Sequence, residues 1–112
     1  IHDASTSLAV FDRLTELRAE KGPCFAILDS DHEKYNVLSE LMIMQRILKP
    51  GDYLIVEDSN LNGNPIRPDF GPGPMEAIRE YETKFPDDYK HDFDREKKFG
   101  FTFAPYGFLV RR

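Results

Sequence analysis

The chain has 112 residues and carries 20 acidic against 15 basic side chains, a formal net charge of −5. A chain of this length forms one small domain, and its acidic balance argues against nucleic acid as the main partner, because phosphates attract a basic surface. No apolar run approaches the ~20 residues that span a bilayer, and no basic stretch of the kind that opens a secretory signal begins the sequence. The single cysteine, Cys24, cannot form an internal disulfide, so we expect a cytoplasmic protein.

The first predicted element is an amphipathic helix over roughly residues 6–20. Its apolar positions recur at steps of three and four, at Leu8, Phe11, Leu14 and Leu17. The preceding residues 1–5 read as the end of a strand that runs into a helix cap, where capping and ligand contact explain Asp3 and Ser5 equally well. Because the chain begins with Ile at such a junction, we expect it to be a piece of a longer protein whose missing part is N-terminal.

Two apolar runs predict short strands over residues 25–28 and 53–56. Between them, Glu33 to Leu48 reads as a helix with one apolar side. The strand–helix–strand order predicts that the two strands are parallel and joined by a right-handed crossover. The first run is apolar throughout, which is typical of a strand buried on both faces, and Cys24 at its start is expected to be a small buried hydrophobic residue.

Acidic residues follow both predicted strands directly: Asp29 comes after the first, and Glu57 and Asp58 come after the second. The carboxyl ends of parallel strands meet at one edge of the sheet, where open α/β folds carry their chemistry. Carboxylates gathered in this way repel one another unless a cation is present, and oxygen ligands of this kind favour Mg²⁺ over Zn²⁺. Capping of the following helices, or pairing with lysine and arginine, accounts for the same acids without a metal.

His32 belongs to the same predicted edge, three positions after Asp29. A neutral imidazole near a metal-bound hydroxyl can take up its proton as a general base. A histidine that only caps or hydrogen-bonds the loop explains the position equally well. The residue types alone therefore leave both explanations open.

Residues 59–74 are crowded with Asn, Gly and Pro and predict a long irregular loop. Such loops are often lids or substrate loops, although a mobile surface loop has the same composition. Asn60 and Asn62 suit contacts with sugars or carboxamides, and turn formation explains them equally well. A helix over residues 75–85 follows, with Pro74 at its first turn.

The C-terminal region combines a charged run with two apolar segments. Residues 86–98 read as a solvated connection in which His91 is a surface histidine. Residues 99–103 and 108–110 are rich in aromatic and β-branched side chains and flank a turn containing Pro and Gly. They predict a hairpin that closes the chain with an antiparallel pair of strands.

Three motifs at these spacings together resemble the cephalosporin hydroxylase and rhamnosyl O-methyltransferase family: LDSDH at 28–32, VED at 56–58 and GPGPMEA at 71–77. The resemblance covers the chain from about Asp3 to its end. It implies an α/β, Rossmann-like three-layer fold of the class I S-adenosylmethionine-dependent methyltransferases, with parallel strands and a C-terminal antiparallel hairpin. Residues 1–112 would then form a single partial domain, the C-terminal half of the methyltransferase domain.

The same resemblance implies an O-methyltransferase that depends on Mg²⁺ and S-adenosylmethionine and acts on a hydroxyl of a small molecule. Sugars, glycolipids and antibiotics are the implied acceptors, which suggests a place in lipid or antibiotic biosynthesis. The family's metal ligands fall on Asp29, Glu57 and Asp58, and the base of related sugar O-methyltransferases falls on His32.

The resemblance places the contacts to the cofactor's adenine at Asp3 and Ser5, but the glycine-rich loop and ribose-binding acid of such enzymes have no counterpart in the sequence. We therefore expect the isolated 112 residues to be inactive, and the apolar strand edges of such a fragment favour self-association into a homo-oligomer. The alternative is a non-catalytic α/β binding or assembly module with a structural cation site. A hydroxylase is disfavoured, because the three histidines offer no facial triad of two His and one carboxylate.

Overall fold

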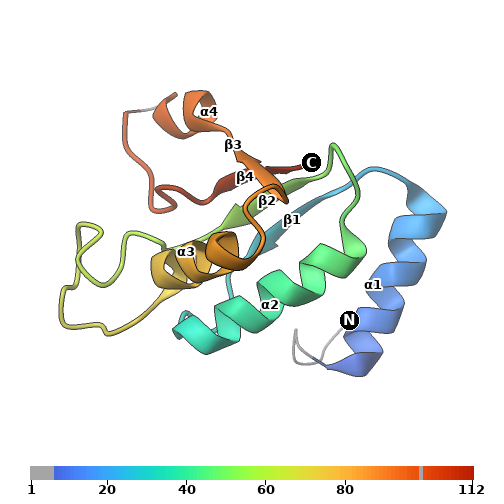
Figure 1. Cartoon of the computed structure of the whole chain (residues 1–112), viewed down its shortest axis with the longest axis horizontal. Helices are drawn as coiled ribbons and strands as arrows, with labels where there is room; N and C mark the ends of the chain where they lie inside the picture. The colour runs from blue at the N-terminus through green and yellow to red at the C-terminus, as the bar shows by residue number, and fades with distance from the viewer. Residues whose placement is uncertain (1–6, 99) are drawn as a thin grey trace.

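A computed structural model of the chain describes residues 7–98 and 100–112. The elements follow one another as α1 (Leu8–Lys21), β1 (Phe25–Leu28), α2 (Lys34–Ile47), β2 (Tyr53–Val56), α3 (Pro74–Lys84), β3 (Tyr89–His91), α4 (Phe93–Lys97) and β4 (Phe108–Arg111). The predicted strands at 25–28 and 53–56 and the three predicted helices are confirmed, with helix ends that shift by one or two residues, whereas the strand end predicted at residues 1–5 lies outside the described residues. Figure 1 shows α2 and α3 on one side of the sheet and α4 on the other. None of the helices in the described ranges has the length and apolar character needed to cross a bilayer.

Local capping explains where the first two helices begin. The Ser7 hydroxyl accepts the backbone N–H of Val10 at 3.2 Å at the start of α1. The Glu33 carboxylate accepts two N–H groups of the first turn of α2. α1 ends at Gly22, whose φ of 84° is left-handed and favours glycine. α2 therefore starts directly after the acidic segment that follows β1.

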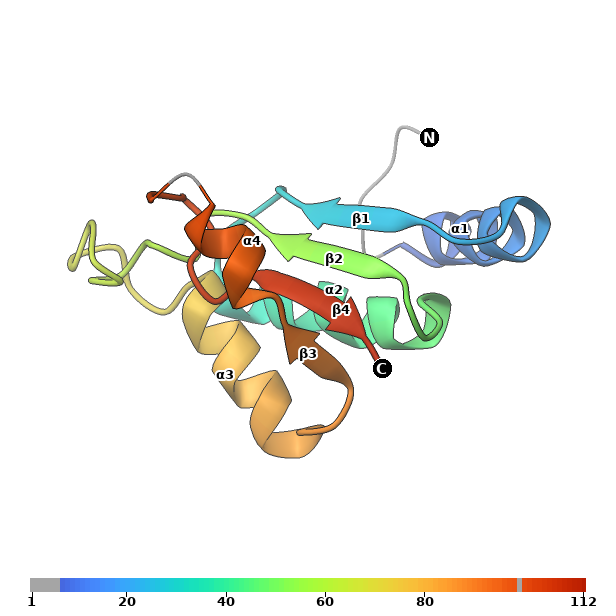
Figure 2. The ribbon, with the colours of Figure 1, turned by 90° about the horizontal axis from the view of Figure 1, so that it is seen from above.

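The four described strands form one sheet in the order β1-β2-β4-β3, and Figure 2 shows them side by side. β1 and β2 are parallel, with Leu28 opposite Val56, and α2 connects them. β4 is antiparallel to both of its neighbours, β2 and β3. The predicted strand–helix–strand unit is confirmed, and it brings the carboxyl ends of β1 and β2 to one edge of the sheet, called the carboxyl edge below.

The C-terminal antiparallel pair is present, but it is built from other residues than predicted. β3 lies inside the 86–98 run and pairs with β4, so that run is not simply a solvated connection. The described part of 99–103 forms no strand, and Phe101 and Phe103 are 65% and 57% exposed. β4 already has β2 on one side and β3 on the other, which leaves no edge for the aromatic run. The prediction of a hairpin from 99–103 and 108–110 is therefore wrong.

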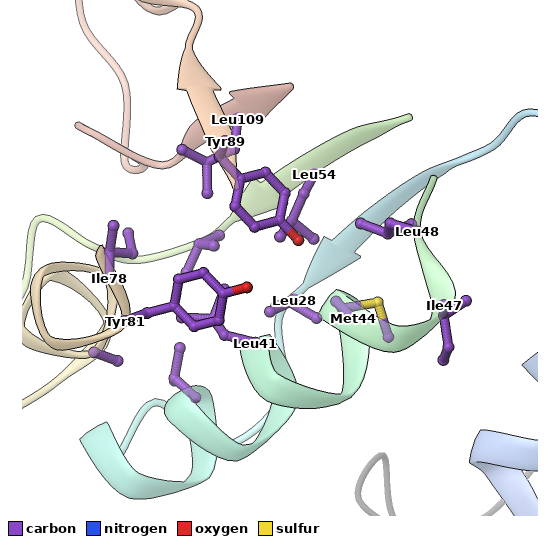
Figure 3. Close-up of a cluster of buried hydrophobic side chains, with 13 residues drawn as sticks. Leu28, Leu41, Met44, Ile47, Leu48, Leu54, Ile78, Tyr81, Tyr89 and Leu109 are labelled. Carbon is purple, nitrogen blue, oxygen red and sulfur yellow. The ribbon is translucent and has the colours of Figure 1, made fainter. Parts of the chain in front are cut away.

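The hydrophobic core lies between the sheet and helices α2 and α3. Its buried side chains come from all four described strands, from both helices and from the residue after α2: Leu28, Val37, Leu41, Met44, Ile47, Leu48, Leu54, Val56, Ala77, Ile78, Tyr81, Tyr89 and Leu109. Figure 3 shows this cluster, in which the rings of Tyr81 and Tyr89 lie 5.9 Å apart between centroids. Full burial of one such side chain contributes about 1.5–3 kcal/mol. This packed layer supports the strands whose ends carry the acidic residues.

The opposite face of the sheet is apolar but only partly covered. Phe25 and Ile27 of β1 are 69% and 50% exposed. Their neighbours on the same face are half-buried: Tyr53, Ile55, Phe108 and Val110. No described helix lies in front of β1 in Figure 2, so the expectation that residues 25–28 are buried on both faces is wrong. Cys24, at the start of this edge strand, is exposed rather than buried.

Tyr53 holds α4 over this second face. Its hydroxyl donates to Asp92 at 2.9 Å, and the Arg95 guanidinium lies 5.4 Å from the centre of its ring. Asp92 also caps α4 by accepting the backbone N–H of Arg95 at 3.1 Å. Burial, followed by the contact with Asp92, raises the pKa of Tyr53 to about 12, so the phenol remains a neutral donor.

Candidate metal site at the carboxyl edge

β1 and β2 bring the predicted acidic residues together. Leu28 and Val56, the last residues of the two strands, are in register, so Asp29 and Glu57 leave the sheet side by side. The backbone N–H of Glu57 donates to the carbonyl of Leu28 at 3.0 Å and extends the pairing beyond the strands. The expected meeting of acids at one edge of the sheet is confirmed.

His32 joins two of these acids. Its Nε2 atom is 2.9 Å from Oδ2 of Asp58 and 3.9 Å from Oδ1 of Asp29. Ligand atoms of these three residues all lie within 4.8 Å of one another, a spacing that one metal ion can bridge. The Asp29 side chain is 63% exposed, against 28% for His32 and 33% for Asp58, so the group opens to solvent on the side of Asp29.

The turn after β2 sets the direction of the Asp58 side chain. Asp58 has a φ of 55°, a left-handed conformation that Asp adopts more readily than most residues. Its carbonyl accepts the N–H of Leu61 at 3.2 Å and closes the turn. The strand before Asp58 and the turn after it hold the residue in this conformation.

Glu57 interacts electrostatically with the other charged residues of the carboxyl edge. Burial raises the pKa of its carboxyl, the carboxylates of Asp29 and Asp58 raise it further, and His32 opposes them. Ionising all the acids at this edge is therefore costly without an added cation. The most closely spaced ligand atoms belong to Asp29, His32 and Asp58, so the structure adds His32 to the ligand candidates and places Glu57 beside them.

Helix capping, the alternative explanation of these acids, falls to other residues. Asp31 accepts the backbone N–H of Glu33 at 3.0 Å, and Glu33 itself caps α2. At α3 the backbone N–H of the cap residue Gly73 donates to Glu76 at 2.8 Å. Asp29, Glu57 and Asp58 therefore cap none of the described helices.

The 59–74 segment is tied down by side-chain hydrogen bonds. Asn62 and Asn64 both donate to Glu76, so the structure gives Asn62 a hydrogen bond within this segment. Asn60 is 1% exposed, and its side-chain N and O atoms find no partner among the described residues. No role was predicted for Asn64 or Glu76 from the sequence. The available signal was the GPGPMEA motif, in which Glu76 falls in the first turn of α3.

His91, expected to be a surface histidine, is largely buried. Its side chain is 13% exposed, pairs with Glu82, and lies against the rings of Phe93 and Tyr106, with centroids 5.2 and 3.8 Å away. The expectation is wrong because His91 lies in β3, where alternate side chains point toward the protein interior. A strand of three residues inside a charged run is too short for this alternation to be recognised in the sequence.

The predicted cofactor contacts, Asp3 and Ser5, lie outside the described residues and stay predictions. In the part of the chain that the structure describes, neither β1 nor β2 leads directly into a glycine-rich turn of the kind that holds a nucleotide. The carboxyl edge has groups suited to holding a metal ion and accepting a proton.

The chain forms an α/β domain whose two parallel strands end beside a group of carboxylates and a histidine, at the edge where open α/β folds commonly bind ligands. Comparison with known proteins shows which class of enzyme shares this sequence. The profile of the family described as Rhamnosyl O-methyltransferase/CmcI matches residues 1–112. The chain belongs to this family of methyltransferases.

Curated relatives carry the name rhamnosyl O-methyltransferase. Those of Mycobacterium tuberculosis and Mycobacterium bovis are 54% identical over 99% of this chain and 46% of the relative. That of Mycobacterium leprae is 56% identical over 100% of this chain and 49% of the relative. The chain therefore spans about half the length of these relatives. No solved structure matches the chain at a significant level.

Proposed function

We propose that this chain is the metal- and acceptor-binding half of an O-methyltransferase that depends on Mg²⁺ and S-adenosylmethionine. Family membership supports methyl transfer to oxygen, and the relatives' name supports a sugar hydroxyl as acceptor. Sugars of glycolipids or antibiotics are the acceptors that the proposal covers. The observation that carries it is the group formed by Asp29, His32 and Asp58 at the carboxyl edge.

Asp29, Glu57 and Asp58 are the residues that would hold Mg²⁺. Their oxygen donors suit a hard cation. The raised pKa of Glu57 is the behaviour expected of an acid in a group that lacks sufficient positive charge. When bound, Mg²⁺ would polarise a hydroxyl of the acceptor and lower its pKa.

His32 would take up the proton of the acceptor hydroxyl. Its Nε2 atom lies 2.9 Å from Asp58, whose carboxylate orients the ring and stabilises the imidazolium formed by proton transfer. Loss of that proton turns the acceptor oxygen into the nucleophile that methyl transfer requires. The same position allows direct metal ligation, so the two roles of His32 need an experiment that separates them.

The methyl donor requires more of the domain than these residues. We place the other half of a full-length protein on the open apolar face around Phe25 and Ile27, where it would complete a Rossmann-like three-layer fold. Relatives about twice as long as the matched region are long enough to contain such a half. Asp3 and Ser5 are the contacts to the donor's adenine that we propose from this chain.

We also propose a cytoplasmic location and self-association of the isolated chain. A single cysteine suits the reducing cytoplasm. The open apolar face favours self-association of the chain when it is produced without the rest of the domain.

Titration calorimetry with MgCl₂ on the 112-residue chain tests the metal site. We expect saturable binding by the wild type and loss of binding in Asp29→Ala. No binding by the wild type would count against the metal site and favour the non-catalytic binding or assembly module.

His32→Ala in a full-length protein separates the roles of the imidazole. If His32 is the base, Mg²⁺ affinity persists and transfer of a labelled methyl group to a rhamnoside falls by roughly 10²–10⁴-fold. Loss of Mg²⁺ binding would make His32 a ligand, and unchanged transfer would make it structural. Methyl transfer by the isolated chain would contradict the half-domain proposal.

A further inference from the structure

The loop between β2 and α3, residues 59–73, is gathered around the carboxylate of Glu76. Its Oε1 atom accepts the side-chain N–H of Asn62 at 3.2 Å and the backbone N–H of Gly73 at 2.8 Å. Its Oε2 atom accepts the side-chain N–H of Asn64 at 3.0 Å. The Glu76 side chain thus ties Asn62 and Asn64, near the start of the loop, to Gly73 at its end.

A carboxylate suits this position better than an amide. It offers two acceptor oxygens and no donor, whereas glutamine at position 76 would turn an NH₂ group toward one of the three donors. Asn62 cannot flip its amide without loss, because its Oδ1 atom already accepts the N–H of Gly71 at 3.1 Å. Asn64 also donates to the carbonyl of Leu61 at 2.8 Å, so a flip would break that bond as well.

Both ends of the loop adjoin the candidate metal site. The loop begins directly after Asp58. At its far end the carbonyl of Pro72 accepts the backbone N–H of Lys34 at 3.1 Å, close in sequence to His32. The loop therefore leaves from one member of the metal group and returns beside another.

Two apolar side chains of the loop remain partly exposed: Ile66 and Phe70, at 39% and 38%. A Cβ atom placed on Gly73 would lie 3.3 Å from the Phe70 ring and 3.4 Å from the carbonyl oxygen of His32. The Phe70 ring thus lies close to the segment that carries His32. Aromatic and apolar side chains beside a few polar groups are the usual lining of small-molecule sites.

We propose that Glu76 is a positioning residue that holds the 59–73 loop as one wall of the acceptor site, where Phe70 contacts the acceptor. This inference rests on the proposed O-methyltransferase function, since the acceptor hydroxyl must reach His32. If Glu76 only capped α3, the hydrogen bond from Gly73 would be sufficient. Loss of the hydrogen bonds from Asn62 and Asn64 would then leave the loop unchanged.

Hydrogen exchange on the 112-residue chain tests the loop without requiring activity. Glu76→Ala should speed exchange in peptides covering 59–73 by roughly tenfold, with α2 beyond its first residue Lys34 unchanged and Glu76→Gln intermediate. Glu80→Gln is the matched control on α3, because the Glu80 carboxylate pairs with Lys34 instead. Equal loop exchange in the wild type and Glu76→Ala would overturn the proposal.

Asn62→Asp keeps the test decisive if Glu76→Ala destabilises the whole chain. Asp has the shape of Asn and tolerates the left-handed φ of 58° at this position. The substitution sets a second carboxylate against Glu76 but leaves the N–H of Gly73 available to cap α3. Faster exchange in the loop supports positioning, and unchanged exchange means that Glu76 acts only as a cap, which overturns the proposal.

Kinetics of a full-length protein test the link to the acceptor. Asn62→Asp and Phe70→Ala should each raise the KM for a rhamnoside by roughly tenfold and leave the KM for S-adenosylmethionine unchanged. A loosened loop with an unchanged acceptor KM would overturn the positioning role while the enzyme function stands. If the wild type transfers no methyl group to any sugar, the proposed function and the acceptor wall fail together, and hydrogen exchange still decides whether Glu76 holds the loop.

Discussion

Carboxylates at the two ends of the parallel strands β1 and β2 have opposite surroundings. At the amino end, Asp52 is 1% exposed and accepts hydrogen bonds from the Arg18 guanidinium at 2.6 and 3.2 Å. Backbone N–H groups of Lys49 and Cys24 donate to the same carboxylate at 2.9 and 3.2 Å. Burial alone would raise the pKa of Asp52, but these partners outweigh burial and lower it from its usual 3.8.

At the carboxyl end, several acids share one imidazole. Asp29 and Asp58 both lie beside His32, and burial together with these two acids raises the pKa of Glu57. The carboxylate at the amino end has its own cation and N–H donors, whereas Asp29 and Asp58 at the carboxyl end share the imidazole of His32. The surroundings of an acid, more than its residue type, tell the structural role from the functional one.

The largest effect should follow from removing the carboxylate at the amino end. Asp52→Ala leaves Arg18 and two backbone N–H groups without their partner, and breaking a buried charge pair in this way costs on the order of 3 kcal/mol. Because the pKa of Asp52 is lowered, its stabilisation is present above 3.8 and is lost as pH falls through the folded-state pKa. Urea unfolding measures both effects.

Glu20→Ala is the control for this substitution, because Glu20 is an exposed acid near the end of α1. It should change the free energy of unfolding by less than about 0.5 kcal/mol. If Asp52→Ala also lost less than about 1 kcal/mol, the contrast between the two ends of the strands would not hold.

At the carboxyl end, removal of a carboxylate charge should leave the stability of the metal-free protein unchanged or increase it. In metal-free protein at about pH 7, Glu57→Gln should match the wild type or exceed its stability by up to about 1 kcal/mol. The pKa of Glu57 is raised in the folded state, so its protonated carboxyl is the form that the fold tolerates. Its favourable contribution is complete below the usual pKa of 4.5 and is lost as pH rises through the folded-state pKa. The stability advantage of Glu57→Gln should therefore vanish near about pH 4.

Thermal unfolding in a chelator at both pH values measures this difference, and saturating Mg²⁺ should reverse the order by stabilising the wild type. A variant that is less stable than the wild type in chelator at about pH 7 would mean that Glu57 helps to hold the fold, as Asp52 does.

The smallest effect on stability is expected on the open face. Phe25 lies at the amino end of β1, next to Cys24, yet it is 69% exposed. Phe25→Gln should change the free energy of unfolding by less than about 0.5 kcal/mol and should weaken self-association. Sedimentation at matched concentrations measures the association.

Tyr35→Gln removes a 66% exposed aromatic ring from α2, on the other side of the sheet, and should leave association unchanged. Equal association of all three proteins would show that the open face is not the contact.

Much of the fold and part of the site follow from local patterns. Apolar spacing is enough to predict the strands at 25–28 and 53–56 and the helix between them. Given those elements, the geometry of the crossover brings Asp29 beside Glu57 without further information. The acidic group was predictable because each of its members directly follows, or nearly follows, a recognisable strand.

Features that depend on distant partners were not predictable. Asp52 reads as a turn residue after Pro and Gly, and its buried role depends on Arg18, 34 positions earlier. Glu76 lies 14 positions after Asn62, and no periodicity links them. β3 is three residues long and exists because β4 has a free edge beside it. Each of these depends on packing that forms only once the elements have come together.

α4 sets a limit on the size of any layer that covers the open face. The hydrogen bond from Tyr53 to Asp92 holds α4 over the part of that face formed by β2 and β4, and the most exposed side chains lie on β1. Because α4 already contacts Tyr53 of β2, the uncovered strip lies along β1 at the edge of the sheet. Neighbouring strands are ~4.8 Å apart, and one α-helix with its side chains is about 10 Å across. The strip has room for one helix along the strands, and a second helix beside it would overlap α4.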